Sequence, residues 1–166
     1  MAEQQLALEV LQQFRVIYGT MRQYFREIEE CCGLTGTQMW VLQEVSRTPG
    51  VGVTELSERI GIHQSTCSQM VDRLVLQGFL SKNHPFKDRR RVGLGLGQTA
   101  QRAIDALPGP AEGILPEALA QIPLVSLETL NVNLRELIRH LPGKNDDFAR
   151  VPLADQVTPS DKTAAR

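Results

Sequence analysis

The stretch from Glu55 to Gly97 constrains the fold of this chain more than any other. It contains two short amphipathic helical segments separated by a small-residue turn, followed directly by a strand, a charged tip and a second strand. In the first segment Leu56 and Ile60 share one face, and Gly61 follows as a natural left-handed C-cap. This order of elements is the one that a winged helix-turn-helix requires.

The second helical segment is predicted to begin near His63 and to end at Gly78. Its apolar positions fall on one inward face: Cys67, Met70 or Val71, and Leu74. The opposite face carries short or amide side chains, with little charge, that can reach base edges or phosphates: Gln64, Ser65, Ser68, Gln69 and Arg73. A helix selected only for solubility would carry more Lys and Glu, so this face indicates a helix that enters a DNA groove.

Basic residues concentrate at the hairpin that would form the wing. Between positions 53 and 102 eight basic residues accompany four acidic ones, giving +4 in a chain of net charge −1, so the remainder carries −5. The basic candidates of the wing are Lys82, Lys87, Arg89, Arg90 and Arg91. A charge run alone is as often a solvated loop. Its place directly after a helix-turn-helix favours contact with phosphates and insertion of an arginine into the minor groove.

Several motifs occur in one order and spacing: Leu34-Thr35 with Gln38, Thr54-Glu55-Leu56-Ser57, Ser65-Thr66-Cys67-Ser68, Asp72-Arg73-Leu74, Gly78-Phe79-Leu80 and Asp88-Arg89-Arg90. Through them the chain resembles, from about 34 to 141, the MarR family of bacterial transcriptional regulators. The resemblance implies an obligate homodimer on a pseudo-palindromic operator. It also implies a major-groove set comprising Ser65, Thr66, Ser68, Gln69 and Arg73. Asp88 would orient the wing, and Arg90 would enter the minor groove.

The chain departs from the family pattern after the second wing strand. Where the family usually has Leu-Thr-x-x-Gly, this sequence reads Leu96-Gly97-Gln98-Thr99-Ala100. The alternation of Gly93, Gly95 and Gly97 places three glycines on one face of the strand. We expect this either to weaken the strand or to let another segment approach its backbone closely.

The N-terminal segment, 1–33, is predicted to be one long helix that ends at Cys31-Cys32-Gly33. An apolar seam runs along it with spacings of three and four residues: Val10, Phe14, Ile17, Met21, Tyr24 and Ile28. The seam is longer than one domain needs to anchor a helix, so we expect part of it to meet a partner subunit. The alternative is a helix that only covers its own core.

Two further kinds of site are considered in this half of the chain. Cys31 and Cys32 are redox candidates, although adjacent cysteines do not easily form a disulfide. Arg22, Tyr24 and Trp40 are candidates for an effector pocket, because the effectors typical of the family are small aromatic or carboxylate compounds. His63 and Cys67 are spaced i, i+4, but no second ligand pair follows, so no metal site is predicted.

The C-terminal third is predicted to complete a dimerisation stem over 98–141. Pro108-Gly109-Pro110 should break this region, helicity should resume over 111–121, and Ser126 should cap a last helix. That helix should bury a leucine-rich stripe: Leu127, Leu130, Leu134, Leu137, Ile138 and Leu141. The tail, 142–166, has few large apolar residues and is expected to be disordered, although Phe148, Val151 and Leu153 could dock.

The resulting prediction is a mainly α fold with a small β-wing: a winged helix-turn-helix over 34–97 between dimerisation helices. No phosphate loop, paired acid–base residues, export signal or membrane-length apolar run is visible. We therefore expect a cytoplasmic, non-enzymatic regulator without cofactors that binds double-stranded DNA and no membrane, and that a small effector releases. The alternatives are a thiol-based redox regulator and a winged helix that contacts proteins instead of DNA.

Overall fold

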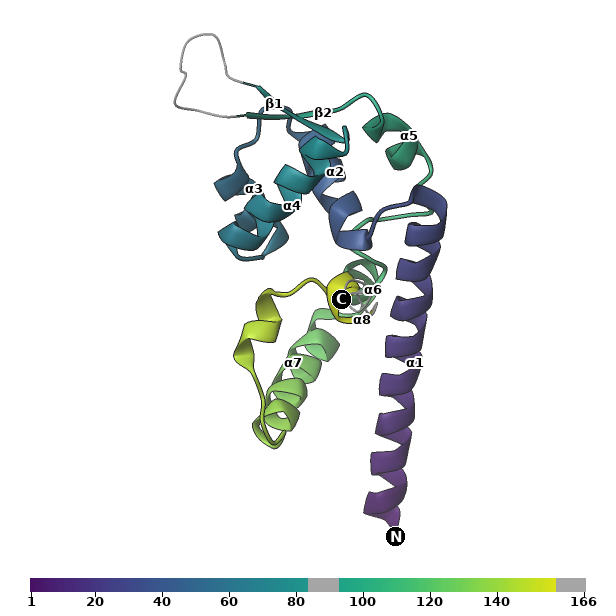
Figure 1. Cartoon of the computed structure of the whole chain (residues 1–166). Helices are drawn as coiled ribbons and strands as arrows, with labels where there is room; N and C mark the ends of the chain where they lie inside the picture. The colour runs from purple at the N-terminus through teal and green to yellow at the C-terminus, as the bar shows by residue number, and fades with distance from the viewer. Residues whose placement is uncertain (84–92, 158–166) are drawn as a thin grey trace, which may run out of the picture.

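The computed structural model describes residues 1–83 and 93–157, and shows a mainly helical chain with a small antiparallel sheet at one end (Figure 1). The elements are, in order, α1 (Ala2–Cys32), α2 (Gly36–Arg47), α3 (Val53–Ile60), α4 (Gln64–Leu76), β1 (Leu80–Asn83), β2 (Gly93–Leu96), α5 (Ala100–Asp105), α6 (Leu115–Gln121), α7 (Leu124–Arg139), the 3-10 helix η1 (Asp146–Arg150) and α8 (Leu153–Val157). The predicted fold class, mainly α with a small β-wing, is confirmed.

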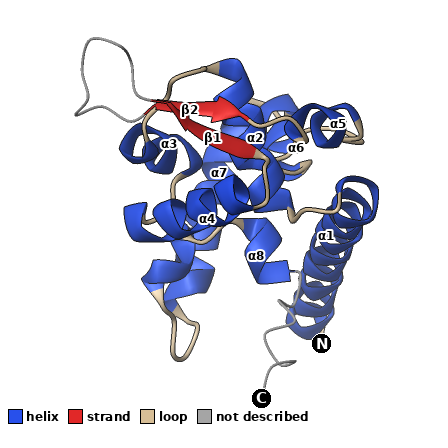
Figure 2. Ribbon diagram, turned by 45° about the horizontal axis from the view of Figure 1, so that its top comes forward, coloured by secondary structure: helices blue, strands red, loops and turns tan. Residues whose placement is uncertain are grey.

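Helices α2, α3 and α4 pack with the sheet into one lobe (Figure 2). Thr35 and Gln38 form a reciprocal capping box that starts α2, and Gly61, at φ 75°, ends α3 as predicted. Of the predicted inward positions, Leu56, Cys67, Val71 and Leu74 are fully buried, Ile60 is 5% exposed and Met70 is half-buried. The helix-turn-helix is therefore held by an apolar core of the kind that the helical spacing predicts.

The glycine-rich strand β2 is packed tightly against other backbone segments. It pairs with β1 in a register that sets Leu80 opposite Leu96. On its other side the N–H of Gly50 donates to the carbonyl of Leu94 at 2.8 Å. A Cβ at Gly93 would lie 2.9 Å from the Gly50 carbonyl oxygen. The close approach expected from the glycine alternation is confirmed.

Helix α1 extends well beyond the lobe, and its N-terminus lies at the far end (Figure 1). Residues 1–20 are all exposed, whereas Met21, Phe25 and Ile28 are buried against the rest of the chain. The apolar seam is therefore covered by the chain itself only in its C-terminal part.

The region after the wing differs in detail from the prediction. The break at Pro108–Pro110 is present, but α6 begins only at Leu115, because residues 111–113 form a turn. Helix α7 begins at Leu124 after Pro123, so Ser126 lies inside the helix and is not its N-cap. The predicted stripe is not buried within this chain: Leu137 is 42% exposed and Leu141 is 51% exposed.

The tail is ordered further than its composition suggested. Residues 142–157 contain η1 and α8, and α8 packs against α1 and α2 with Ala154 and Val157 buried. Thr37 donates to Asp155 at 2.9 Å, which ties α8 to α2. Disorder was thus the wrong expectation for 142–157, because small apolar side chains dock in a groove between two helices. Phe148, one of the residues that could have docked, is 60% exposed.

Among the described helices, none has both the length and the apolar character that spanning a bilayer requires.

Candidate nucleic-acid interface

Helix α4 presents a polar face to solvent because its opposite face is locked into the core. Cys67, Val71 and Leu74 are fully buried, at spacings of four and three residues. The face opposite is exposed at Gln64, Ser65, Thr66, Gln69 and Arg73, while Ser68 is half-buried. The structure thus brings these six predicted residues together on one helix of the lobe, with hydroxyl and amide groups available at its surface.

The start of α4 is tied to the helix before it. The Gln64 Nε2 donates to the Thr54 Oγ1 at 2.9 Å. Ser57 is buried within α3 and donates its hydroxyl to the Thr54 carbonyl oxygen at 2.7 Å. The Gln64–Thr54 bond joins the two helices and helps to set the direction in which the exposed face of α4 points, while the Ser57 bond lies within α3.

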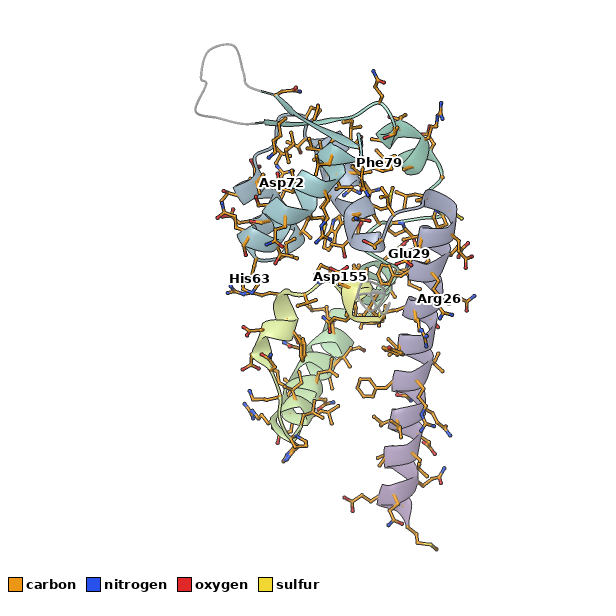
Figure 3. All side chains as sticks on the ribbon, in the orientation of Figure 1. Arg26, Glu29, His63, Asp72, Phe79 and Asp155 are labelled. Carbon is orange, nitrogen blue, oxygen red and sulfur yellow. The ribbon has the colours of Figure 1, made fainter. Side chains whose placement is uncertain are left out.

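Charged groups around this face are partly paired. Lys82 on β1 forms an ion pair with Asp72 on α4, with 2.6 Å between Nζ and Oδ1, and Figure 3 labels Asp72 in the lobe. Arg59 contacts Glu55 at 2.6 Å and Glu44 at 3.5 Å. Arg73 has no ion pair with any other described residue. It is therefore the basic side chain of α4 that is free to meet a phosphate.

The Asp72–Lys82 pair was not predicted from the sequence. Its members are ten residues apart on different elements, and only the path of the chain from α4 into β1 brings them together. The remaining wing candidates, Lys87, Asp88, Arg89, Arg90 and Arg91, lie outside the described residues.

The cysteines differ in their surroundings. Cys31 is exposed, Cys32 is half-buried and Cys67 is buried, and all three are free thiols. Burial, with a contribution from Cys31, raises the pKa of the Cys32 thiol, and burial raises the pKa of Cys67 to about 11. A raised pKa lowers the fraction of reactive thiolate near neutral pH. Within residues 1–83 and 93–157 there is also no cluster of three potential metal ligands.

The three effector candidates do not meet at one site. Trp40 lines a cavity of about 220 Å³ between α1, α2 and the C-terminal segment, but Arg22 and Tyr24 do not line it. The Tyr24 hydroxyl donates to the Pro110 carbonyl at 2.9 Å. Burial and then the charge of Glu112 raise the pKa of Tyr24. The Nε of Arg22 is buried without a hydrogen-bond partner among the described residues.

Comparison with known proteins finds similarity to one family over part of the chain. Residues 33–91 match the model of the MarR family. The HTH-type transcriptional repressor MdtR of Bacillus subtilis (strain 168) is 27% identical over 92 residues, which cover 55% of this chain and 59% of that protein. The chain thus matches little more than half the length of this relative.

Solved structures share the fold at low sequence identity. The YusO protein from Bacillus subtilis is 20% identical with a TM-score of 0.53, covering 83% of this chain and 98% of that one. A MepR mutant from S. aureus, bound to an oligodeoxyribonucleotide, is 18% identical with a TM-score of 0.52, covering 80% and 98%. The matched segment 33–91 begins just before α2 and contains the whole helix-turn-helix. Through this segment, the chain is similar to the MarR family.

Proposed function

We propose that this protein is a DNA-binding transcriptional regulator that acts as a homodimer on a pseudo-palindromic operator and is released by a small-molecule effector. The observation that carries the proposal is the exposed hydroxyl-and-amide face of α4, held outward by three fully buried residues of the same helix. The match to the MarR family supports the same conclusion. The relative MdtR is named a transcriptional repressor, which supports the prediction that the chain is a regulator and not an enzyme.

Each part of the interface has a distinct proposed role. Gln64, Ser65, Thr66, Ser68 and Gln69 would read base edges in the major groove, where amides and hydroxyls can pair with base donors and acceptors. Arg73 and the basic wing residues would contact phosphates. Arg90 would enter the minor groove with Asp88 orienting the wing, as the family resemblance implies. Repression is favoured over activation by the relative MdtR, which is named a repressor.

Homodimer formation is supported by apolar surface that the single chain leaves uncovered. The N-terminal half of α1 and the C-terminal end of α7 line an apolar groove of about 680 Å³, with Leu6, Val10 and Phe14 on one side and Leu137 and Leu141 on the other. A second copy that covers this groove would place two α4 helices on one duplex. Operator binding then requires their spacing to match successive major grooves, roughly 34–36 Å apart.

The first experiment is a search for the operator. Sheared DNA from the source genome is incubated with the purified full chain, the bound fragments are recovered, and the best fragment is titrated at several salt concentrations. We expect enrichment of an inverted repeat with a steep dependence of affinity on salt. Retention of DNA that depends only weakly on salt concentration and not on sequence would overturn the proposal. The remaining interpretation would be a winged helix that contacts proteins.

Two variants separate base reading from phosphate contact. Gln69→Ala should lower affinity for the operator by roughly 1–3 kcal/mol and leave the salt slope unchanged. The salt slope is the slope of the logarithm of affinity against the logarithm of salt concentration. Arg73→Ala should reduce its magnitude by about 0.9 for each phosphate that the arginine neutralises, and each protomer loses one arginine. Arg139→Ala is the matched control, since it removes the same charge from α7, where Arg139 pairs with Glu136 at 2.9 Å. Equal effects of Arg73→Ala and Arg139→Ala would exclude Arg73 as a phosphate contact, and an unchanged affinity of Gln69→Ala as well would exclude α4 as the contact surface.

A further inference from the structure

The cavity of about 220 Å³ lies where three parts of the chain meet. Phe25 of α1, Trp40 of α2 and Glu112, in the turn before α6, line it, and residues 149 and 151–154 of the C-terminal segment close it. Ala154 of α8 is among the lining residues, and Figure 3 labels its neighbour Asp155 on α8 and Glu29 on α1. The C-terminal segment therefore forms a wall of this cavity, and the cavity lies outside the proposed DNA interface.

Two aromatic rings form a rigid part of the lining. Phe25 is 2% exposed, and its ring packs directly on two glycines. A Cβ at Gly36 would lie 2.5 Å from the ring, and one at Gly113 would lie 2.8 Å from it. The Phe25 ring thus has little freedom to move. Trp40 is half-buried and adds a second, larger ring to the same cavity.

The turn that carries Glu112 is held in place on both sides. Tyr24 of α1 donates to the Pro110 carbonyl at 2.9 Å, and the Ala111 N–H donates to the Gln43 side chain of α2 at 3.4 Å. Ala111 itself is 1% exposed. Glu112 is therefore positioned by α1 and α2 before any ligand arrives, which lowers the cost of binding.

Among the described residues, the cavity lining carries the acidic Glu112 and no basic side chain. The Oε2 of Glu112 is buried and has no hydrogen-bond partner among the described residues. None of the described residues that line the cavity is Lys, Arg or His. Thr37, which also lines it, already donates to Asp155. A buried carboxylate oxygen without a partner is costly, and a cation beside aromatic rings would remove that cost.

We propose that this cavity binds a small aromatic cation, with the Glu112 carboxylate pairing its charge and Phe25 and Trp40 contacting its ring. The volume is below the roughly 300–1,000 Å³ typical of drug-sized ligands, which favours a single ring bearing one cationic group. The charge preference is opposite to that of the carboxylate effectors considered from the sequence. Calling the occupant an effector rests on the proposed regulatory function, whereas the binding itself does not.

Three probes of nearly equal shape and different charge test this directly: benzamidine, which is cationic, benzamide, which is neutral, and benzoate, which is anionic. Trp40 is the only tryptophan of the chain, so its fluorescence reports on this cavity. We expect benzamidine to change Trp40 emission in a saturable way, with an affinity at least about tenfold above that of benzamide, because bonds to charged groups contribute roughly 1.5–3 kcal/mol. Equal affinities for the three probes, or tighter binding of benzoate, would overturn the proposal.

A matched pair of variants then tests the assigned carboxylate. Glu112→Gln should weaken benzamidine binding by roughly tenfold or more and leave benzamide binding unchanged, which also shows that the cavity is intact. Glu117→Gln removes the same charge from the exposed first turn of α6, outside the cavity lining, and should leave both affinities unchanged. The assignment fails if the two variants behave alike. Should Glu112→Gln fail to fold, the three probes on the unchanged protein still decide charge preference.

The effector role is measured separately, by titrating benzamidine into the complex with the recovered operator. Dissociation of the unchanged protein but not of Glu112→Gln would establish the cation as an effector. Binding to Trp40 without release of DNA would reject the effector role and leave the binding site. If no operator is recovered, the proposed function fails, while the fluorescence result still decides the proposal about the cavity.

Discussion

At the scale of single residues, the wing depends on glycines that are packed against backbone. A Cβ at Gly97 would collide with the carbonyl oxygen of Gly78, the residue that leads from α4 into β1. The N–H of Gly97 also donates to the Phe79 carbonyl at 2.8 Å. At Gly95 an added Cβ would meet only side-chain ends, those of Asn83 at 2.9 Å and Ser81 at 3.0 Å. An added methyl group would therefore meet backbone atoms at Gly97 but only side-chain atoms at Gly95.

Alanine substitutions at these two glycines should differ in stability. Gly97→Ala should lower the free energy of unfolding by roughly 1–3 kcal/mol, because backbone atoms have to move to admit the methyl group. Gly95→Ala should change it by no more than about 1 kcal/mol, since the Asn83 and Ser81 side chains can rotate away. Urea unfolding followed by circular dichroism measures both. Equal losses would show that the backbone around Gly78 yields as easily as a side chain.

The same positions show how far sequence reasoning extends. The glycine alternation predicts a close approach, but it does not identify Gly50 and Gly78 as the neighbours, because these come from other turns of the chain. The outward face of α4 is predictable because helical periodicity alone assigns Cys67 and Leu74 inward. Glu112 carries no such signal. Its place in a cavity depends on α1, α2 and a break at Pro108–Pro110, whose path no local pattern specifies.

At the scale of elements, α8 is a short helix held by tertiary contacts. With five residues it has too few internal hydrogen bonds to be stable alone. Ala154 and Val157 are buried against α1 and α2, and Asp155 accepts a bond from Thr37. Composition predicted disorder here because it counts large apolar residues, and the docking residues are small.

Ser126 is of a residue type that often caps helices, but it is not the N-cap of α7. The helix begins at Leu124, two residues earlier, after the extended backbone of Pro123.

The docking of α8 predicts that the burial of a side chain in this segment affects the free energy of unfolding more than its size does. Val157→Ala should lower the free energy of unfolding by about 1–3 kcal/mol, because it removes methyl groups from a site that is 3% exposed. Phe148→Ala, in the neighbouring η1, removes a larger side chain that is 60% exposed and should cost no more than about 0.5 kcal/mol. Urea unfolding at fixed protein concentration measures both values. A larger loss for Phe148→Ala would mean that η1, and not α8, anchors this segment.

At the scale of the whole molecule, α1 is divided into two unequal environments. The face that buries Met21, Phe25 and Ile28 continues toward the N-terminus through Val10 and Phe14, each 40% exposed. The same spacing of three and four residues runs through both parts, so the change lies in what covers the face. The N-terminal part of α1 therefore presents an uncovered apolar face. This favours contact with a partner subunit over the alternative that α1 only covers the core of its own chain.

A charge placed on this face should therefore separate the subunits. Phe14→Glu puts a carboxylate into the apolar groove shared by α1 and α7, once per protomer, and should raise the dimer dissociation constant by a factor on the order of 100 or more. Gln12→Glu adds the same charge on the opposite face of α1, about 160° away at 100° per residue, and should leave the dimer intact. Light scattering after size-exclusion chromatography gives the mass of each. The operator affinity of Phe14→Glu should fall together with its mass, because one protomer contacts only one half-site. A Phe14→Glu protein that remains dimeric would show that the subunits meet elsewhere, and an unchanged protein that is monomeric would remove the homodimer from the proposed function.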